Sequence, residues 1–271
     1  MYFQAILAVS PRDTLSWRRS GLQRAADLTS LRLQIPVQPV FDEDLLQAFR
    51  ARNKAGTLNN GSALAWLAHL HVLEVATAFT SVLILEDDAD WGEDIHSQMS
   101  DVAAAVRKLV QADTTAWPHE EDWDVLWLGH CGESLPFDQF GNHSVSYHDP
   151  TIPSHVNSWE KAFEEKTRYV HFSVGPVCSY AYAVSRVGAS RILVAEHGND
   201  QAFDIWLHVA CRSLLRCISV NPEIFHEHVP QDRSGSLVNS GRVGWSDRRR
   251  VGTDNILHSA RSRAKLMDSH E

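Results

Sequence analysis

The sequence predicts a single α/β domain in which a central, mostly parallel sheet is flanked by helices. Short apolar runs rich in β-branched residues alternate with longer helical patterns, which is typical of this class. Two of the runs, 81–85 and 123–129, are apolar on both faces, as strands are when helices cover both sides of a sheet. The length of 271 residues suits one large domain, and we find no linker that would divide it.

The expected elements follow from these patterns in chain order. Strands are expected at 2–9, 35–40, 81–85, 123–129, 177–184 and 217–220. Helices are expected at 13–28, 42–52, from the turn at 59–62 to about 79, and at 94–111, 185–196 and 200–212. Pro36 and Pro39 place the second strand at a sheet edge, because proline cannot donate to a central ladder. The stretch from His130 to Tyr169 has little periodicity and is expected to be a long functional loop.

Composition and charge exclude several classes of protein. Hydrophobic residues make up 44% and charged residues 22% of the chain, which is ordinary for a globular protein and argues against disorder. The formal charge of −9 argues against a general nucleic-acid binder, which needs a basic face. The sequence has no long apolar run, so we expect no membrane-spanning segment.

The four cysteines are too few for a disulfide scaffold in a chain of this size. They form no Cys-x-x-Cys pair, which excludes a zinc ribbon or a thioredoxin-type motif. Cys211 and Cys217 are near enough in sequence to bridge, although this spacing alone does not establish a disulfide.

The most informative motif is an acidic strand end. The apolar run that ends at Leu85 is followed at once by four carboxylates, those of Glu86, Asp87, Asp88 and Asp90. Ligands of open α/β sheets bind beyond the carboxyl ends of the strands, and crowded carboxylates repel one another unless a cation neutralises them. Mg²⁺ and Mn²⁺ take such oxygens together with substrate phosphates. The motif therefore predicts a metal ion that joins the protein to a diphosphate; a solvated acidic turn without function is the other interpretation.

In its setting this motif resembles that of glycosyltransferase family 25. The resemblance spans about Ala5 to His228, and residues 127–133 and 181–185 are most similar to the fungal branch. It rests on the order of several segments, which are Leu85–Asp88, the preceding helix with Gly61 and His69, and 123–129. The family, which includes bacterial lipooligosaccharide glycosyltransferases and collagen galactosyltransferases, implies a GT-A-type fold, a nucleotide-sugar donor and usually Mn²⁺. Residues 1–232 would then form the GT-A-like domain, and residues 233–271 an Arg-rich tail or flap.

The resemblance also implies where the metal ion binds. Carried onto this chain, Asp88 is the metal ligand, and Glu86 or Asp87 contacts the donor. Asp90 adds an Asp-x-Asp alternative, so the register of the metal ligand stays open. His228 is implied as a further metal ligand, because transferases of this fold often close the metal site with a histidine late in the chain.

The remaining site residues also depend on the resemblance. Arg12, in a segment that matches the family in part, and His69 are implied donor-site residues. Asp200 opens a predicted helix, shares a face with Asp204 and His208, and matches a family aspartate. It is the implied general base that takes the proton of the acceptor hydroxyl. The alternative is that Asp200 only favours the start of a helix.

These features lead us to expect an inverting, Mn²⁺- or Mg²⁺-dependent glycosyltransferase. It would move a sugar, galactose by resemblance, from a UDP-sugar to a glycan or glycoprotein acceptor. A metal-dependent phosphoesterase and a non-catalytic sugar-binding relative are the alternatives. The family implies the lumen of the secretory pathway, in the endoplasmic reticulum or Golgi. Residues 1–9 predict a strand and not a signal peptide, so a cytoplasmic location is expected if no leader is missing.

Overall fold

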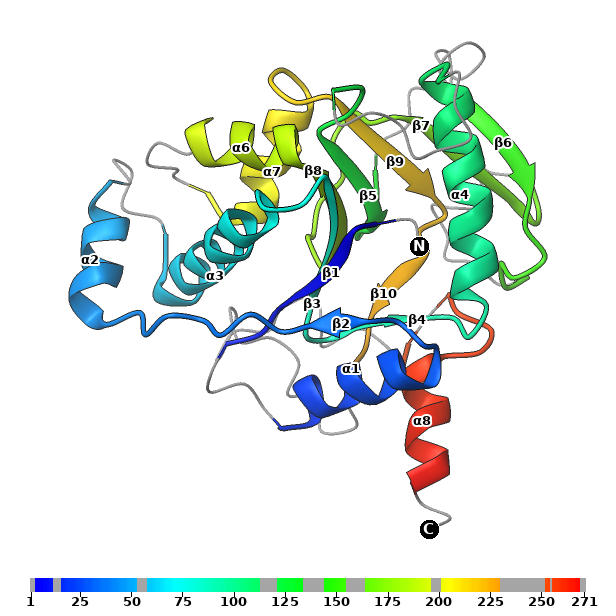
Figure 1. Ribbon diagram of the computed structural model, residues 1–271, viewed down its shortest axis with the longest axis horizontal. Helices are drawn as coiled ribbons and strands as arrows, with labels where there is room; N and C mark the ends of the chain where they lie inside the picture. The colour runs from blue at the N-terminus through cyan, green and yellow to red at the C-terminus, as the bar shows by residue number, and fades with distance from the viewer. Residues whose placement is uncertain are drawn as a thin grey trace.

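The computed structural model describes residues 3–11, 16–52, 58–112, 121–133, 144–154, 164–195, 201–229, 252–253 and 255–268. This part of the chain forms one large sheet with helices on both faces (Figure 1). The strands are β1 Ala5–Val9, β2 Leu33–Gln34, β3 Ser81–Glu86, β4 Ala89–Trp91, β5 Val125–Gly129, β6 Ser144–His148, β7 Thr167–Phe172, β8 Ala181–Ser185, β9 Cys217–Asn221 and β10 Phe225–Glu227. The helices are α1 Ser16–Leu28, α2 Glu43–Ala51, α3 Asn60–Ala76, α4 Ile95–Leu109, α6 Arg186–Ala195, α7 Phe203–Cys211 and α8 Ala260–Asp268.

The main sheet has eight strands in the order β2-β1-β3-β8-β5-β9-β7-β6. β8 runs antiparallel to both of its neighbours, and β7 does the same. The other pairings are parallel, so six of the eight strands run in one direction. The α/β class with a large, mixed sheet between helices is therefore confirmed. A second, two-stranded sheet pairs β4 with β10.

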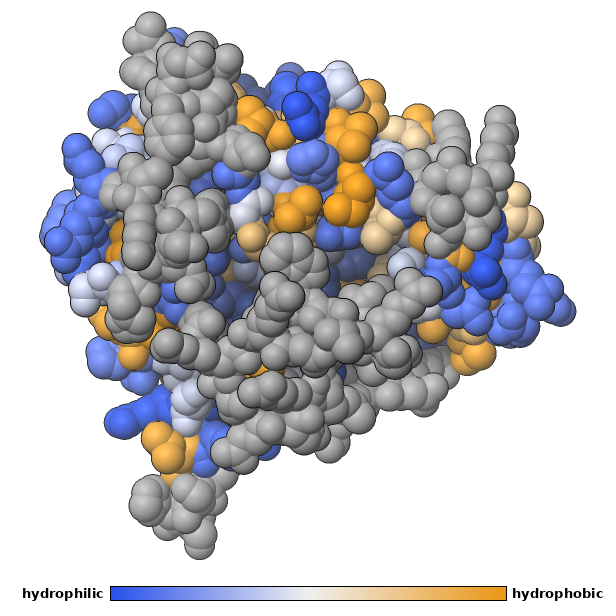
Figure 2. Space-filling model, turned by 180° about the vertical axis from the view of Figure 1, so that it is seen from behind, coloured by the Kyte–Doolittle hydropathy of each residue, from blue (hydrophilic) through white to orange (hydrophobic). Residues whose placement is uncertain are grey.

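Alternating side chains of the strands feed two hydrophobic cores. Leu83 and Leu85 of β3 pack with α1, α4 and α8 on one face. Val82 and Ile84 pack with α2, α3, α6 and α7 on the other. These strands are buried on both faces, as their continuous apolar runs predict. At the surface seen in Figure 2, groups of hydrophobic residues lie between hydrophilic areas, as is usual for folded proteins.

Two expectations about individual elements are wrong. The second strand is at 33–34, before the proline-containing stretch, although it does lie at the sheet edge. The stretch from His130 to Tyr169 contains β6 and the first half of β7, which pair as antiparallel neighbours at the other edge of the sheet. Half-buried edge strands with polar and aromatic residues give a weak period-2 pattern, which explains why the sequence did not reveal them.

All four cysteines are paired. Cys211 forms a disulfide with Cys217 at the end of α7. Cys131 follows β5 and Cys178 precedes β8, and because these strands are neighbours the two residues meet and bridge across 47 positions of sequence. The second bridge depends on tertiary structure, so spacing could not predict it.

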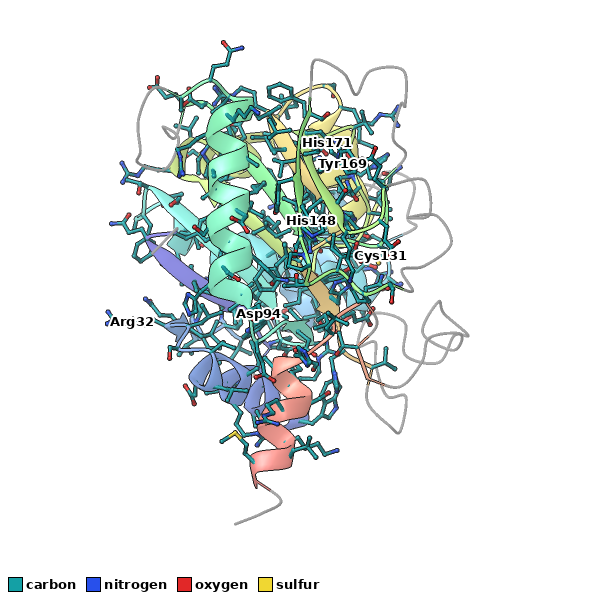
Figure 3. All side chains as sticks on the ribbon, turned by 90° about the vertical axis from the view of Figure 1, so that its right-hand side faces the viewer. Arg32, Asp94, Cys131, His148, Tyr169 and His171 are labelled. Carbon is teal, nitrogen blue, oxygen red and sulfur yellow. A yellow bond between two sulfur atoms is a disulfide. The ribbon has the colours of Figure 1, made fainter. Side chains whose placement is uncertain are left out.

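The C-terminal helix packs against the body of the protein. α8 lies against α1, and the backbone amide of Glu93, just before α4, donates to the carbonyl of His258 at 2.9 Å. Figure 3 shows α4 across the sheet, with Asp94 at the end of the helix nearest α8. Among the described helices, none has the length and hydropathy that a membrane span requires.

Candidate functional site

The acidic motif lies where β3 ends at the edge of the main sheet. Glu86 is paired with Val9 of β1, so the carboxyl ends of these two parallel strands meet there. After the turn at 87–88 the chain enters β4, in which Asp90 lies opposite His226 of β10. α1 and α8 pack against β4. The carboxylates are thus held between two sheets and two helices.

Asp87 and Asp88 are buried and share one arginine. Arg18 of α1 donates from Nε to Oδ1 of Asp87 at 2.5 Å and from Nη2 to Oδ2 of Asp88. The hydroxyl of Ser10 donates to the other oxygen of Asp87 at 3.0 Å. Oδ1 of Asp88 is buried and has no hydrogen-bond partner among the described residues. Buried carboxylate oxygens are normally hydrogen-bonded, so this oxygen is available to bind a cation or a hydrogen-bond donor of a ligand.

Asp90 is fully buried, and its oxygens are taken by protein donors. Oδ1 accepts from the backbone amides of Trp91 at 2.8 Å and Arg261 at 3.1 Å. Oδ2 accepts from the hydroxyls of Thr253 and Ser259, both at 2.5 Å. Asp90 therefore fastens the segment before α8 to the strand end. Of the two aspartates in the Asp-x-Asp alternative, Asp88 has the free oxygen.

Arg261 of α8 supports the backbone of the acidic turn. Its guanidinium donates to the carbonyls of Asp87 at 2.6 Å, Ala89 at 2.7 Å and Arg18 at 3.2 Å. Gly21 of α1 permits this approach, because a Cβ there would lie 2.5 Å from Nη1 of Arg261. Burial lowers the pKa of Arg261 to about 10, although the nearby aspartates oppose this, so the side chain stays charged at neutral pH.

Glu86 differs from the three aspartates because its side chain is 30% exposed. Ser179, just before β8, donates to Oε1 of Glu86 at 2.8 Å, and Nε2 of His69 lies 3.4 Å from the same oxygen. Burial alone would raise the pKa of Glu86. The hydrogen bond and charge of His69, together with Ser179 and Arg18, outweigh this effect and lower the pKa below its ordinary value. Glu86 is therefore an ionised acceptor at the surface of the site, suited to bind hydroxyl groups.

His69 is placed behind Glu86 and not in the open part of the site. Its residue is only 2% exposed, its ring stacks on Phe203 at 4.3 Å between centroids, and Nδ1 lies 3.0 Å from the hydroxyl of Tyr182. The structure thus brings His69 to the predicted site, in contact with Glu86.

A fifth carboxylate, that of Asp204 in the first turn of α7, lies near Glu86. Oδ2 of Asp204 accepts from the backbone amide of Cys178 at 3.1 Å. Cys178 has a φ of 68° and is held by its disulfide to Cys131. Burial raises the pKa of Asp204, and the charge of Glu86 adds to the rise. Asp204 shares its predicted helix with Asp200, and no feature of the sequence distinguished it as the better candidate.

His228 adjoins the acidic turn, and its backbone amide donates to the carbonyl of Asp88 at 2.9 Å. Nδ1 lies 2.8 Å from the hydroxyl of Thr253, which donates its own hydrogen to Asp90. The hydroxyl must therefore accept from Nδ1–H, which leaves the lone pair of the neutral ring on Nε2. Burial lowers the pKa of His228, which favours the neutral ring. This is the form in which histidine binds metals.

The residues fit a divalent cation whose shell is completed by a ligand. No three His, Cys, Asp or Glu side chains in the described ranges are arranged to hold one ion by themselves. Mg²⁺ and Mn²⁺ need only one or two carboxylates when substrate phosphates and water supply the rest. The pKa of Asp88 is raised to about 6, first by burial and then by the charges of Glu86 and Asp87. The charge of Arg18 lowers this pKa but does not cancel the rise. A cation would relieve this crowding of charge.

Two predicted residues, Arg12 and Asp200, lie outside the described residues. The others, from Glu86 to Asp90 with His69 and His228, come together around the acidic turn. Arg18, Arg261, Ser179 and Tyr182 were missed, because an arginine in an amphipathic helix or a polar tail normally indicates a solvated surface. Comparison with protein-family models and with curated proteins finds no match to this chain.

Proposed function

We propose that this protein is an inverting, metal-dependent glycosyltransferase that transfers a sugar from a UDP-sugar, with a GT-A-type fold. The observation that carries the proposal is Oδ1 of Asp88, a buried carboxylate oxygen without a partner at the carboxyl edge of the sheet. Such an edge is where α/β proteins bind nucleotides. The resemblance of the acidic motif to family 25 supports the same function.

The proposal assigns a role to each residue of the site. Asp88 holds the Mn²⁺ or Mg²⁺ ion, and Nε2 of His228, whose backbone is bonded to the turn, is the second protein ligand. When bound, the ion offsets the charge that develops on the departing diphosphate. Glu86, exposed and ionised, accepts hydrogen bonds from the donor ribose, while His69 and Ser179 hold its carboxylate in place.

Inverting transfer also needs a carboxylate that removes the acceptor hydroxyl proton. Asp200 is proposed for this role from the family resemblance, and it lies outside the described residues. Asp204 is the carboxylate that the structure places near Glu86, and burial raises its pKa, which favours proton uptake. The sugar is proposed to be galactose and the acceptor a glycan or glycoprotein, both from the family alone.

The two disulfides support the proposed secretory location. Disulfides form and persist in oxidising compartments, such as the lumen of the endoplasmic reticulum, and are rare in the cytosol. With all four cysteines paired, the chain suits such a compartment better than the cytoplasm.

A thermal-shift screen of nucleotide sugars, with and without Mn²⁺, tests the proposed function. A ligand that binds only the folded state stabilises it by RT ln(1 + [L]/Kd), so the melting temperature rises as the ligand concentration exceeds Kd. We expect a UDP-sugar to raise Tm only when Mn²⁺ is present. Hydrolysis of the donor that is as fast without an acceptor as with one would favour a phosphoesterase. Sugar binding that survives chelation would favour a non-catalytic protein.

A further inference from the structure

The guanidinium of Arg18 occupies the position between the two carboxylates of the acidic turn. It is 5% exposed and contacts Asp87 through Nε and Asp88 through Nη2, so one edge of the cation bridges both side chains. A divalent ion held by the same pair would need those oxygens. On the basis of the proposed metal site, we propose that Arg18 is an internal counter-ion that competes with the metal and leaves the carboxylates when the metal binds.

The oxygens that Arg18 occupies favour exchange over simple addition. Its guanidinium is bonded to Oδ1 of Asp87 and to Oδ2 of Asp88, so an ion that takes either oxygen must displace one of these hydrogen bonds. A guanidinium and a divalent ion on the same oxygens would be two cations in contact in a buried site, which is strongly unfavourable. An ion that binds both carboxylates is therefore expected to displace Arg18 from them.

Arg18, and not Arg261, is the arginine that can exchange. Each side-chain hydrogen bond given above for Arg261 ends on a backbone carbonyl, so this residue holds the turn whether or not the carboxylates bind a metal. Arg18 instead binds the carboxylate oxygens themselves. Oδ1 of Asp88, which Arg18 leaves without a partner, offers the first contact for an incoming ion.

This arrangement predicts that the protein without nucleotide binds Mn²⁺ weakly, because Arg18 competes for the same oxygens. The Kd for Mn²⁺ can be measured on the full chain without an activity assay, by titration calorimetry or from the electron paramagnetic resonance signal of free Mn²⁺. In Arg18→Gln we expect the Kd for Mn²⁺ to fall by at least about tenfold, because a full charge in contact with the ligands is removed. The melting temperature of Arg18→Gln should fall without metal and recover when Mn²⁺ is added.

Arg50→Gln is the matched control. Arg50 lies in α2, which packs on the other face of the sheet from α1, and it donates to the carbonyl of Leu58 and to the side chain of Asn60. Its Mn²⁺ affinity should equal that of the parent. If Arg18→Gln does not fold, Arg18→Lys serves, since an ammonium lacks the planar fork and cannot bridge both carboxylates equally well. A smaller tightening is then expected.

Unchanged or weaker Mn²⁺ binding in the folded Arg18 variants would overturn the inference and make Arg18 a fixed structural counter-ion. This failure is distinct from failure of the proposed function. A parent that binds a UDP-sugar with Mn²⁺, beside Arg18 variants with unchanged Mn²⁺ affinity, contradicts the inference alone. Tighter Mn²⁺ binding in Arg18→Gln, without binding of any nucleotide sugar by the parent, contradicts the function alone.

Discussion

Nε2 of His69 lies 3.4 Å from Oε1 of Glu86, and the two side chains differ in their access to solvent. His69 is buried in the sheet-facing side of α3, whereas Glu86 is partly exposed at the strand end. Burial raises the pKa of Tyr182 well above its ordinary value, so its hydroxyl keeps its hydrogen and can donate to Nδ1. Nε2 carries a hydrogen toward Glu86 in this tautomer and also in the charged ring, so His69 donates to the carboxylate of Glu86 and holds it in place.

We expect His69→Phe to weaken donor binding without abolishing it. Glu86 loses a donor to its charged form, and a hydrogen bond to a charged group contributes about 1.5–3 kcal/mol, so the Kd should rise by about tenfold or more. His71→Phe on the same helix is the control, because His71 lies 3.9 Å from the exposed Glu74 and not near the site. Isothermal titration with UDP and Mn²⁺ measures both. Equal affinities for the two variants would contradict this role.

Asp88→Asn should abolish Mn²⁺-dependent UDP binding and leave the fold intact. The amide keeps the size of the carboxylate and can still accept from Arg18, but it is a poor ligand for a hard cation. Asp101→Asn, on the exposed face of α4, is the control and should bind UDP as the parent does. Circular dichroism checks the fold and calorimetry the binding. If the Asp88 variant binds UDP with Mn²⁺ normally, the metal site lies elsewhere.

The stability of the metal-free protein should report the titration of Asp88. Its pKa rises from an ordinary value of 3.8 to about 6 on folding, so its contribution is fully present below the unfolded pKa and is lost as pH rises through about 6. Asp88→Asn has no such loss. The Tm of the variant relative to the parent should therefore increase between about pH 4 and about pH 7. A difference that stays constant over this window would show that Asp88 is not protonated on folding.

The sequence predicted the central strands well because burial on both faces leaves a strong local pattern. The apolar runs 82–85 and 125–128 form the centres of β3 and β5, and the bounds of both strands could be predicted within two residues. β6 and β7 gave no such pattern, since their burial depends on which neighbours cover a sheet edge. That information lies in the tertiary structure and not in the local sequence.

The candidate site could be predicted only where its residues are adjacent in sequence. Glu86, Asp87, Asp88 and Asp90 are adjacent in sequence, so their convergence at one strand end follows from the strand itself. Arg18 and Arg261 come from positions 69 or more residues away, and the pairing of a buried arginine with a carboxylate has no local signature. The sequence could not distinguish Asp88, with a free oxygen, from Asp90, whose oxygens are taken.

The two disulfides should differ in their effect on the site. Cys131–Cys178 closes a segment of 47 positions and holds Ser179 against Glu86, whereas Cys211–Cys217 spans 6 positions at the end of α7. Loop entropy predicts losses of stability of about 4 and about 2 kcal/mol, respectively, when each pair is replaced by serine. Only Cys131→Ser/Cys178→Ser should also weaken UDP binding. Thermal unfolding and calorimetry separate the effects, and equal donor binding by both double variants would contradict the positioning of Glu86.

Asp200→Asn and Asp204→Asn separate the two candidates for the general base. Loss of a general base lowers the rate about 10²–10⁴-fold, and donor binding should persist because the metal and Glu86 hold the nucleotide. Asn matches Asp in size at both positions, and Asn at position 204 can still accept from the amide of Cys178, so neither change should unfold the protein. Transfer of isotope-labelled sugar and titration with the donor measure chemistry and binding separately. The family resemblance predicts that Asp200→Asn loses transfer alone. If only Asp204→Asn loses transfer and its donor affinity is unchanged, Asp204 is the general base and not Asp200. If either variant loses donor binding, that residue is a ligand of the donor or of the metal.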